Sequence, residues 1–91
     1  MYEAIKLSQN LLIKVINKFG MRSQKNKAIE ELSELIQALS KDLNGEKHNV
    51  EEEIADVEIM LAQMRLIYNQ PIINEFIDAK LERLKSRFNE I

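Results

Sequence analysis

The chain has 91 residues, of which 45% are hydrophobic and 31% charged, and 13 Lys and Arg against 15 Asp and Glu give a formal net charge of -2. This length predicts one domain spanning 1–91, and the near-neutral charge argues against a nucleic-acid-binding surface. The absence of cysteine and the single histidine, His48, exclude disulfides, thiolate metal sites and most Ser-His or Cys-His catalysis.

No apolar run approaches the roughly 20 residues that span a bilayer, and the first residues lack a signal-peptide pattern. We therefore expect a cytoplasmic protein without membrane attachment. Two glycines and one proline in an otherwise helix-forming composition predict an all-α fold. Gly20, Gly45 and Pro71 divide the chain into four segments, and short connections between helices predict a four-helix up-down bundle.

The first predicted helix covers 2–19 and ends at Gly20. The second covers about 23–43 and carries the clearest apolar stripe of the chain, which is predicted to face the core. The stripe repeats at steps of three and four residues: Ile29, Leu32, Ile36, Leu39 and Leu43.

Asn49 is predicted to be the N-cap of a third helix that reaches about residue 68, with Glu52 at the N3 position of a variant capping box. Apolar residues surround most of this helix, which predicts that a second protomer covers part of it and that the protein is an oligomer. Asn69 and Pro71 then separate it from a fourth helix that reaches about residue 88.

Two acidic residues of the third helix fall inside its apolar arc. Glu53 projects between Val57 and Met60, and Asp56 lies about 60° from Glu53 on the helical projection. A buried carboxylate requires a cation or strong hydrogen-bond donors. The pair therefore indicates a site.

The second helix offers a matching pair, Glu31 and Glu34, with Glu30 beside them. Eighteen residues lie between Glu34 and Glu53, and an antiparallel hairpin would bring the two pairs together. Mg²⁺ fits four carboxylates best, with Mn²⁺ as the alternative, because hard cations take oxygen ligands. Each motif alone also has an ordinary explanation, as a solvated acidic face or a helix cap, so only the combination is informative.

The combination Glu31-Leu32-Ser33-Glu34, 18 residues, then Glu53-Ile54-Ala55-Asp56 resembles the E-x-x-E…E-x-x-D signature of the MazG-like all-α nucleoside triphosphate pyrophosphohydrolases. The strings 28–39 and 52–61 also resemble that family's second and third helices, and the likeness covers about 20–87. The resemblance implies conversion of a (d)NTP to the (d)NMP and pyrophosphate by a homodimer or homotetramer.

By the same resemblance, Mg²⁺ would be held by Glu31, Glu34, Glu53 and Asp56. Either Glu30 or Glu34 would accept the proton of the attacking water. The triphosphate would meet Lys27, Lys80 and Arg83, and Gln24 would read a base edge. For these last four, an ordinary surface role is the competing interpretation.

The base preference stays open, because the chain has no Trp and carries Met60 where several relatives have an aromatic residue. Two other functions compete with hydrolysis. One is a non-catalytic helical interaction or regulatory protein of the same fold, and the other is a structural coiled coil or bundle. The structural alternative predicts polar residues around Glu53, which the sequence does not have.

Overall fold

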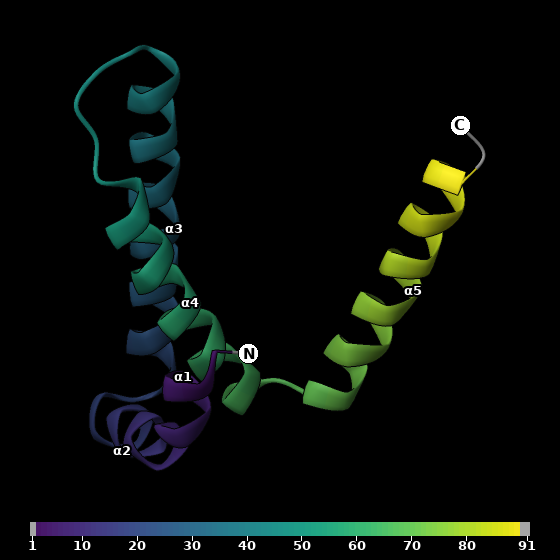
Figure 1. Cartoon of the computed structure of the whole chain (residues 1–91). Helices are drawn as coiled ribbons and strands as arrows, with labels where there is room; N and C mark the ends of the chain where they lie inside the picture. The colour runs from purple at the N-terminus through teal and green to yellow at the C-terminus, as the bar shows by residue number, and fades with distance from the viewer. Residues whose placement is uncertain (1, 90–91) are drawn as a thin grey trace.

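The computed structural model describes residues 2–89, and this part of the chain is all-α, as the sequence predicts (Figure 1). Its helices are α1 (Glu3–Leu7), α2 (Gln9–Phe19), α3 (Met21–Leu43), α4 (Val50–Ile67) and α5 (Gln70–Asn89). Among these described helices, none has the length and apolar character needed to cross a membrane.

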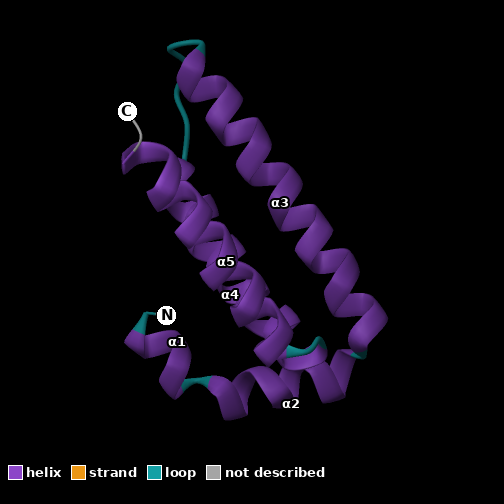
Figure 2. Ribbon diagram, turned by 90° about the vertical axis from the view of Figure 1, so that its right-hand side faces the viewer, coloured by secondary structure: helices purple, strands orange, loops and turns teal. Residues whose placement is uncertain are grey.

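The first predicted helix is in fact two helices, α1 and α2, which are separated at Ser8. The Ser8 hydroxyl donates a hydrogen bond to the Ala4 carbonyl at 2.8 Å, and this local bond competes with regular helix formation. Gly20 alone joins α2 to α3, with φ 90° and ψ 152°. The chain therefore turns sharply there, and α2 crosses below the foot of α3 (Figure 2).

An antiparallel hairpin of α3 and α4 forms the centre of the molecule (Figure 2). Its loop, 44–49, contains Gly45 at φ 72° and is fastened by His48. The His48 Nδ1 accepts a hydrogen bond from the Val50 amide at 3.4 Å, and its Nε2 lies 3.0 Å from the Asp42 carboxylate. The imidazole thereby links the end of α3 to the start of α4.

The predicted capping box at the start of α4 is wrong. Asn49 does precede the helix, but its side chain makes no capping hydrogen bond. Instead the Asn49 amide donates to Glu53 Oε1 at 2.8 Å. Three acidic residues in the first turn of α4 still interact favourably with the helix dipole.

The prediction that the apolar stripe of α3 faces the core is also wrong for the single chain. Its five members are 40–88% exposed. The face of α3 that packs on α4 carries Gln24, Ala28, Glu31 and Ala38, all of which are buried. The two alanines are small enough to let the helices approach closely, so the bulky stripe lies to one side of the contact.

The rest of the small core comes from α2 and α4. Its buried apolar residues beyond α3 are Leu12, Val57, Met60 and Ala62. Helix α5 contributes no buried residue and projects away from the hairpin, as Figure 1 shows. Within residues 2–89, one chain thus forms a hairpin with α1 and α2 across one end and an open arm.

Candidate metal centre

Five predicted acids form a cluster where the start of α4 crosses the middle of α3. One carboxylate oxygen from each of Glu31, Glu53 and Asp56 lies within 4.8 Å of the other two. The same is true of Glu30, Glu31 and Glu34 on α3. Glu31 belongs to both groups, so it connects the acids of the two helices into one cluster.

Two of these carboxylates are buried and only half satisfied. Glu31 and Glu53 are each 8% exposed, and the Oε2 atom of each has no hydrogen-bond partner. Their Oε1 atoms are paired, with Lys27 Nζ at 3.3 Å and Asn49 Nδ2 at 2.8 Å respectively. Leaving a buried charged oxygen without a partner is costly, and carboxylate oxygens are the ligands that hard divalent cations prefer.

The charge of the cluster raises the pKa values of one of its members, Glu34, and of the adjacent Lys27. The negative charge of Glu31, followed by burial and the charge of Glu53, raises the pKa of the Glu34 carboxyl above its usual value. The hydrogen bond to Glu31 and the charge of Glu30 raise the pKa of Lys27. Both shifts have the direction that a concentration of negative charge produces.

The predicted substrate-binding residues are divided by the fold. Lys27 lies beside the acids, within 3.9 Å of Glu30 as well as close to Glu31. Gln24 is only 7% exposed. This burial excludes the competing interpretation of Gln24 as an ordinary surface residue. Lys80 and Arg83 are exposed on α5, the arm that leaves the hairpin (Figure 1), and one chain does not bring them to the acids.

Two observations on α4 were not predicted from the sequence, namely the contact of Asn49 with Glu53 and the burial of Gln63. Asn49 holds Glu53, and its position four residues before Glu53 on one helix face was the available signal. Gln63 is 4% exposed and its Oε1 has no partner. It follows Asp56 by seven residues, which places both on the same face of α4.

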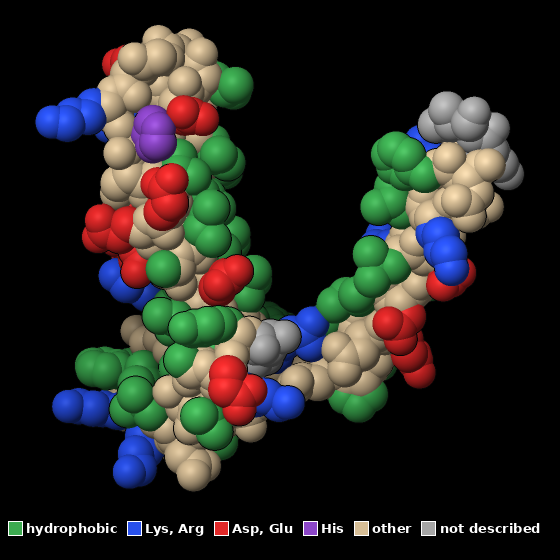
Figure 3. All heavy atoms as spheres, in the orientation of Figure 1, with side chains coloured by type: hydrophobic (Ala, Val, Ile, Leu, Met, Phe, Trp, Pro, Cys, Tyr) green, Lys and Arg blue, Asp and Glu red, His purple; other side chains and the backbone are tan. Residues whose placement is uncertain are grey.

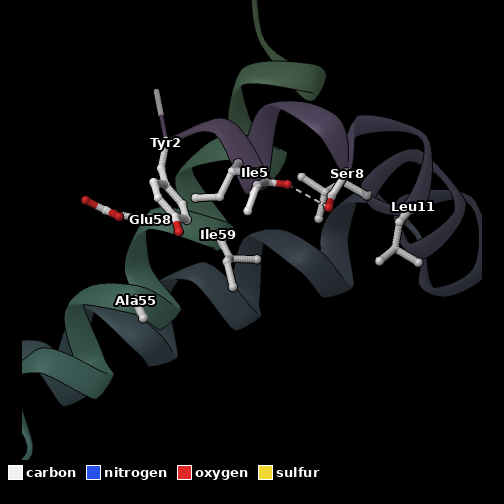
Figure 4. Close-up of a pocket in the computed structure, with 9 residues that line it drawn as sticks. Tyr2, Ile5, Ser8, Leu11, Ala55, Glu58 and Ile59 are labelled. Atoms are coloured by element: carbon white, nitrogen blue, oxygen red, sulfur yellow. Dashed lines mark hydrogen bonds between the residues drawn. The ribbon is translucent and has the colours of Figure 1, made fainter.

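An apolar pocket lies apart from the acids. It has a volume of ≈ 550 Å³, lies between α1, α2 and α4, and is lined by apolar side chains including Ile5, Leu11 and Ile59, with Glu58 at its edge (Figure 4). Its lining lacks the convergent polar groups typical of a substrate site. The acidic cluster is therefore the stronger candidate for chemistry.

Comparisons of this chain with protein-family models, with curated proteins and with solved structures found no match. We therefore infer the function from the residues of the chain itself, above all from the buried carboxylates of Glu31 and Glu53.

Proposed function

We propose that this protein is a Mg²⁺-dependent nucleoside triphosphate pyrophosphohydrolase of the MazG-like kind, which converts a (d)NTP to the (d)NMP and pyrophosphate. The observation that carries the proposal is the pair of buried, unpartnered oxygens of Glu31 and Glu53 inside a cluster of acids from two helices. Such a cluster suits a hard divalent cation. The spacing of its acids also matches the E-x-x-E…E-x-x-D signature described above.

In this proposal the metal ligands are Glu31, Glu34, Glu53 and Asp56. Bound Mg²⁺ would neutralise phosphate oxygens and favour attack of water at the α-phosphorus. The chain's own contribution is to fix the ligands before substrate arrives. Asn49 orients the Glu53 carboxylate, and Lys27 forms an ion pair with the Glu31 carboxylate.

The remaining residues of the cluster have simpler roles. Glu30 is exposed and lies beside Glu31, where it is available to accept the proton of the attacking water, with Glu34 as the alternative. Lys27 offers a positive charge to the triphosphate at the edge of the cluster. Gln24 is buried in the first turn of α3, and its side-chain amide can both donate hydrogen bonds to a base and accept them from it.

Product analysis tests the proposal. A panel of standard and modified (d)NTPs is incubated with Mg²⁺ or with chelator, and the nucleotide and phosphate products are identified. We expect a monophosphate and pyrophosphate from at least one substrate, only with Mg²⁺. Glu53→Gln should lower this activity about a hundredfold or more.

The matched control is Glu52→Gln, which removes an exposed carboxylate next to Glu53 on the same helix and should retain the activity. Absence of turnover across the panel, with the helical content of the protein intact, would instead favour a non-catalytic interaction protein.

A further inference from the structure

The polar groups that the apolar pocket lacks lie in a second pocket beside it. The apolar pocket has a volume of ≈ 550 Å³, and the second pocket, of ≈ 420 Å³, lies between α1, α4 and α5. Three residues line both pockets: Tyr2, Ile5 and Glu58. The two spaces therefore adjoin at these residues, and each has the size of a small-molecule site.

The apolar pocket suits a hydrophobic group of a ligand. Leu11 and Ile59 line it, although they are large apolar residues with exposures of 59% and 43%. A ligand that covered them would gain free energy by removing this surface from water. Figure 4 shows Tyr2 and Glu58 at one end of the lining and Leu11 at the other. A polar part of the ligand would therefore leave the apolar pocket at the end where Glu58 lies.

The second pocket gathers hydrogen-bond donors at the start of α5. Arg65 is partly buried there, and its Nη1 donates to Asn74 Oδ1 at 2.8 Å. This bond positions the guanidinium and leaves its other N–H groups available. The side-chain amides of Gln70 and Asn74 line the same pocket. A guanidinium beside amide groups is an arrangement that recognises a carboxylate.

Glu58 places a negative charge at the junction of the two pockets. It precedes Arg65 by seven residues, so both project from the same side of α4. Within residues 2–89, neither of them forms an ion pair. On the face drawn in Figure 3, acidic and basic side chains stand among hydrophobic ones around the place where α1, α4 and α5 meet. The junction thus offers a carboxylate to an amine of the ligand.

We propose that the joined pockets bind a free α-amino acid with a large apolar side chain. In such a molecule one carbon carries all three groups that the site accommodates. The side chain enters the apolar pocket, the carboxylate meets Arg65, and the ammonium group meets Glu58. A fatty acid would bring no amine to Glu58, and a hydrophobic amine would bring no anion to Arg65, so neither complements both charges.

This site is independent of the proposed hydrolysis. None of the five clustered acids lines either pocket. A bound amino acid would contact α1, α4 and α5 together, although α5 has no buried residue of its own. Binding should therefore stabilise the attachment of α5 and raise the Tm of the protein.

The first test uses the wild-type chain and tryptophan as the probe. The chain has no Trp, so indole fluorescence reports the ligand alone. We expect the emission of L-tryptophan to shift to shorter wavelength and to saturate as protein is added. Tryptophanamide lacks the carboxylate and N-acetyltryptophan lacks the ammonium group. Each should bind about tenfold or more weakly than tryptophan, and alanine should compete poorly because it has little apolar surface to bury.

The second test assigns each charge of the ligand to its residue. Arg65→Met should weaken the binding of tryptophan about tenfold or more and change that of tryptophanamide little. Glu58→Gln should weaken the binding of tryptophan and change that of N-acetyltryptophan little. Arg22→Met and Glu51→Gln are the matched controls, because they remove exposed charges outside both pockets, and they should bind tryptophan as wild type does. Circular dichroism verifies that all four variants remain helical.

Three results would overturn the proposal. The first is an unchanged tryptophan emission at millimolar concentrations of wild-type protein. The second is binding of indole alone as tightly as tryptophan, which would show an apolar pocket without recognition of charge. The third is an equal loss of tryptophan and tryptophanamide binding in Arg65→Met, which would mean that Arg65 only supports the fold. The first two results need no variant, so they decide the matter even where a substitution prevents folding.

Discussion

Glu31 and Glu53 share one arrangement: a buried carboxylate with one oxygen paired and the other without a partner. Burial disfavours a charge that is not fully compensated. In the absence of metal these residues therefore reduce the stability of the fold, and we expect the protein to recover that stability when a cation binds.

Replacing Glu53 with Gln should consequently stabilise the metal-free protein. The amide keeps a hydrogen-bonding side chain of the same size but removes the buried charge, for a gain of about 1 kcal/mol, or roughly 4–8 °C in Tm. Thermal unfolding in chelator measures this shift. For the exposed control Glu52→Gln we expect a change within about 0.5 kcal/mol, and a lower Tm for Glu53→Gln than for wild type would contradict the prediction.

Asn49 should matter through Glu53 rather than through the helix end, because its side chain bonds the carboxylate and makes no cap. Asn49→Ala should weaken Mg²⁺ binding by about tenfold, in the range of residues that orient metal ligands. Asn49→Asp should weaken it further, since it sets a like charge against Glu53. Calorimetric titration measures both, and equal affinities for wild type and the two variants would rule out the positioning role.

Lys27 is the positive charge nearest the acids, so its removal separates metal binding from substrate binding. Lys27→Met should strengthen Mg²⁺ binding a few-fold, because the site becomes more negative, and raise KM for the triphosphate. Lys25→Met is the control from the same helix, because Lys25 lies over the Tyr68 ring, 4.8 Å from its centroid. A KM unchanged by Lys27→Met would remove Lys27 from the substrate site.

The acidic cluster was the part of the site that the sequence predicted best. Helical periodicity alone placed Glu53 among apolar neighbours, and the spacing of the two pairs required only a hairpin. The role of Asn49 was hidden because an Asn before a helix is usually its cap. Lys80 and Arg83 could not be placed in the same way. Helical periodicity predicts which face of a helix they occupy, but it does not predict where that helix lies relative to the acids.

At the scale of elements, the joint between α2 and α3 depends on Gly20. Its φ of 90° and ψ of 152° lie in a region that only glycine adopts readily, at a cost of about 1–3 kcal/mol for other residues. A Cβ at Gly20 would meet no atom within 4 Å, so backbone strain alone sets the penalty.

Gly20→Ala should therefore lower the stability by about 1–3 kcal/mol in denaturant unfolding. Gly45, at φ 72° in the hairpin loop, provides the comparison, because asparagine also tolerates the left-handed region. Gly45→Asn should cost less than Gly20→Ala. The reverse order would mean that the sharp turn at Gly20 does not form in solution.

Helix class and approximate ends followed from composition, from Gly20 and Gly45, and from Pro71, which does lie in the first turn of α5. The break at Ser8 did not, because a serine hydroxyl that bonds the backbone leaves no periodic signal. The apolar stripe of α3 was predicted to face the core, but in the single chain it lies outside the contact with α4. An amphipathic pattern shows which side of a helix is apolar, whereas the size of Ala28 and Ala38 decided where α4 packs.

At the scale of the molecule, the exposed apolar stripe of α3 and the helix α5, which has no buried residue, are surfaces that the predicted oligomer would cover. The sequence pointed the same way through the apolar residues around α4, and the oligomer stays a prediction until the mass is measured.

We propose above all that Glu31, Glu34, Glu53 and Asp56 form a cation site. Calorimetric titration of Mg²⁺ into metal-free protein tests it most directly, because it requires no knowledge of the substrate. We predict saturable binding of at least one ion per chain for wild type and Glu52→Gln, and none for Glu53→Gln. No binding to wild type, or equal binding to wild type and Glu53→Gln, would show that these acids do not form a cation site.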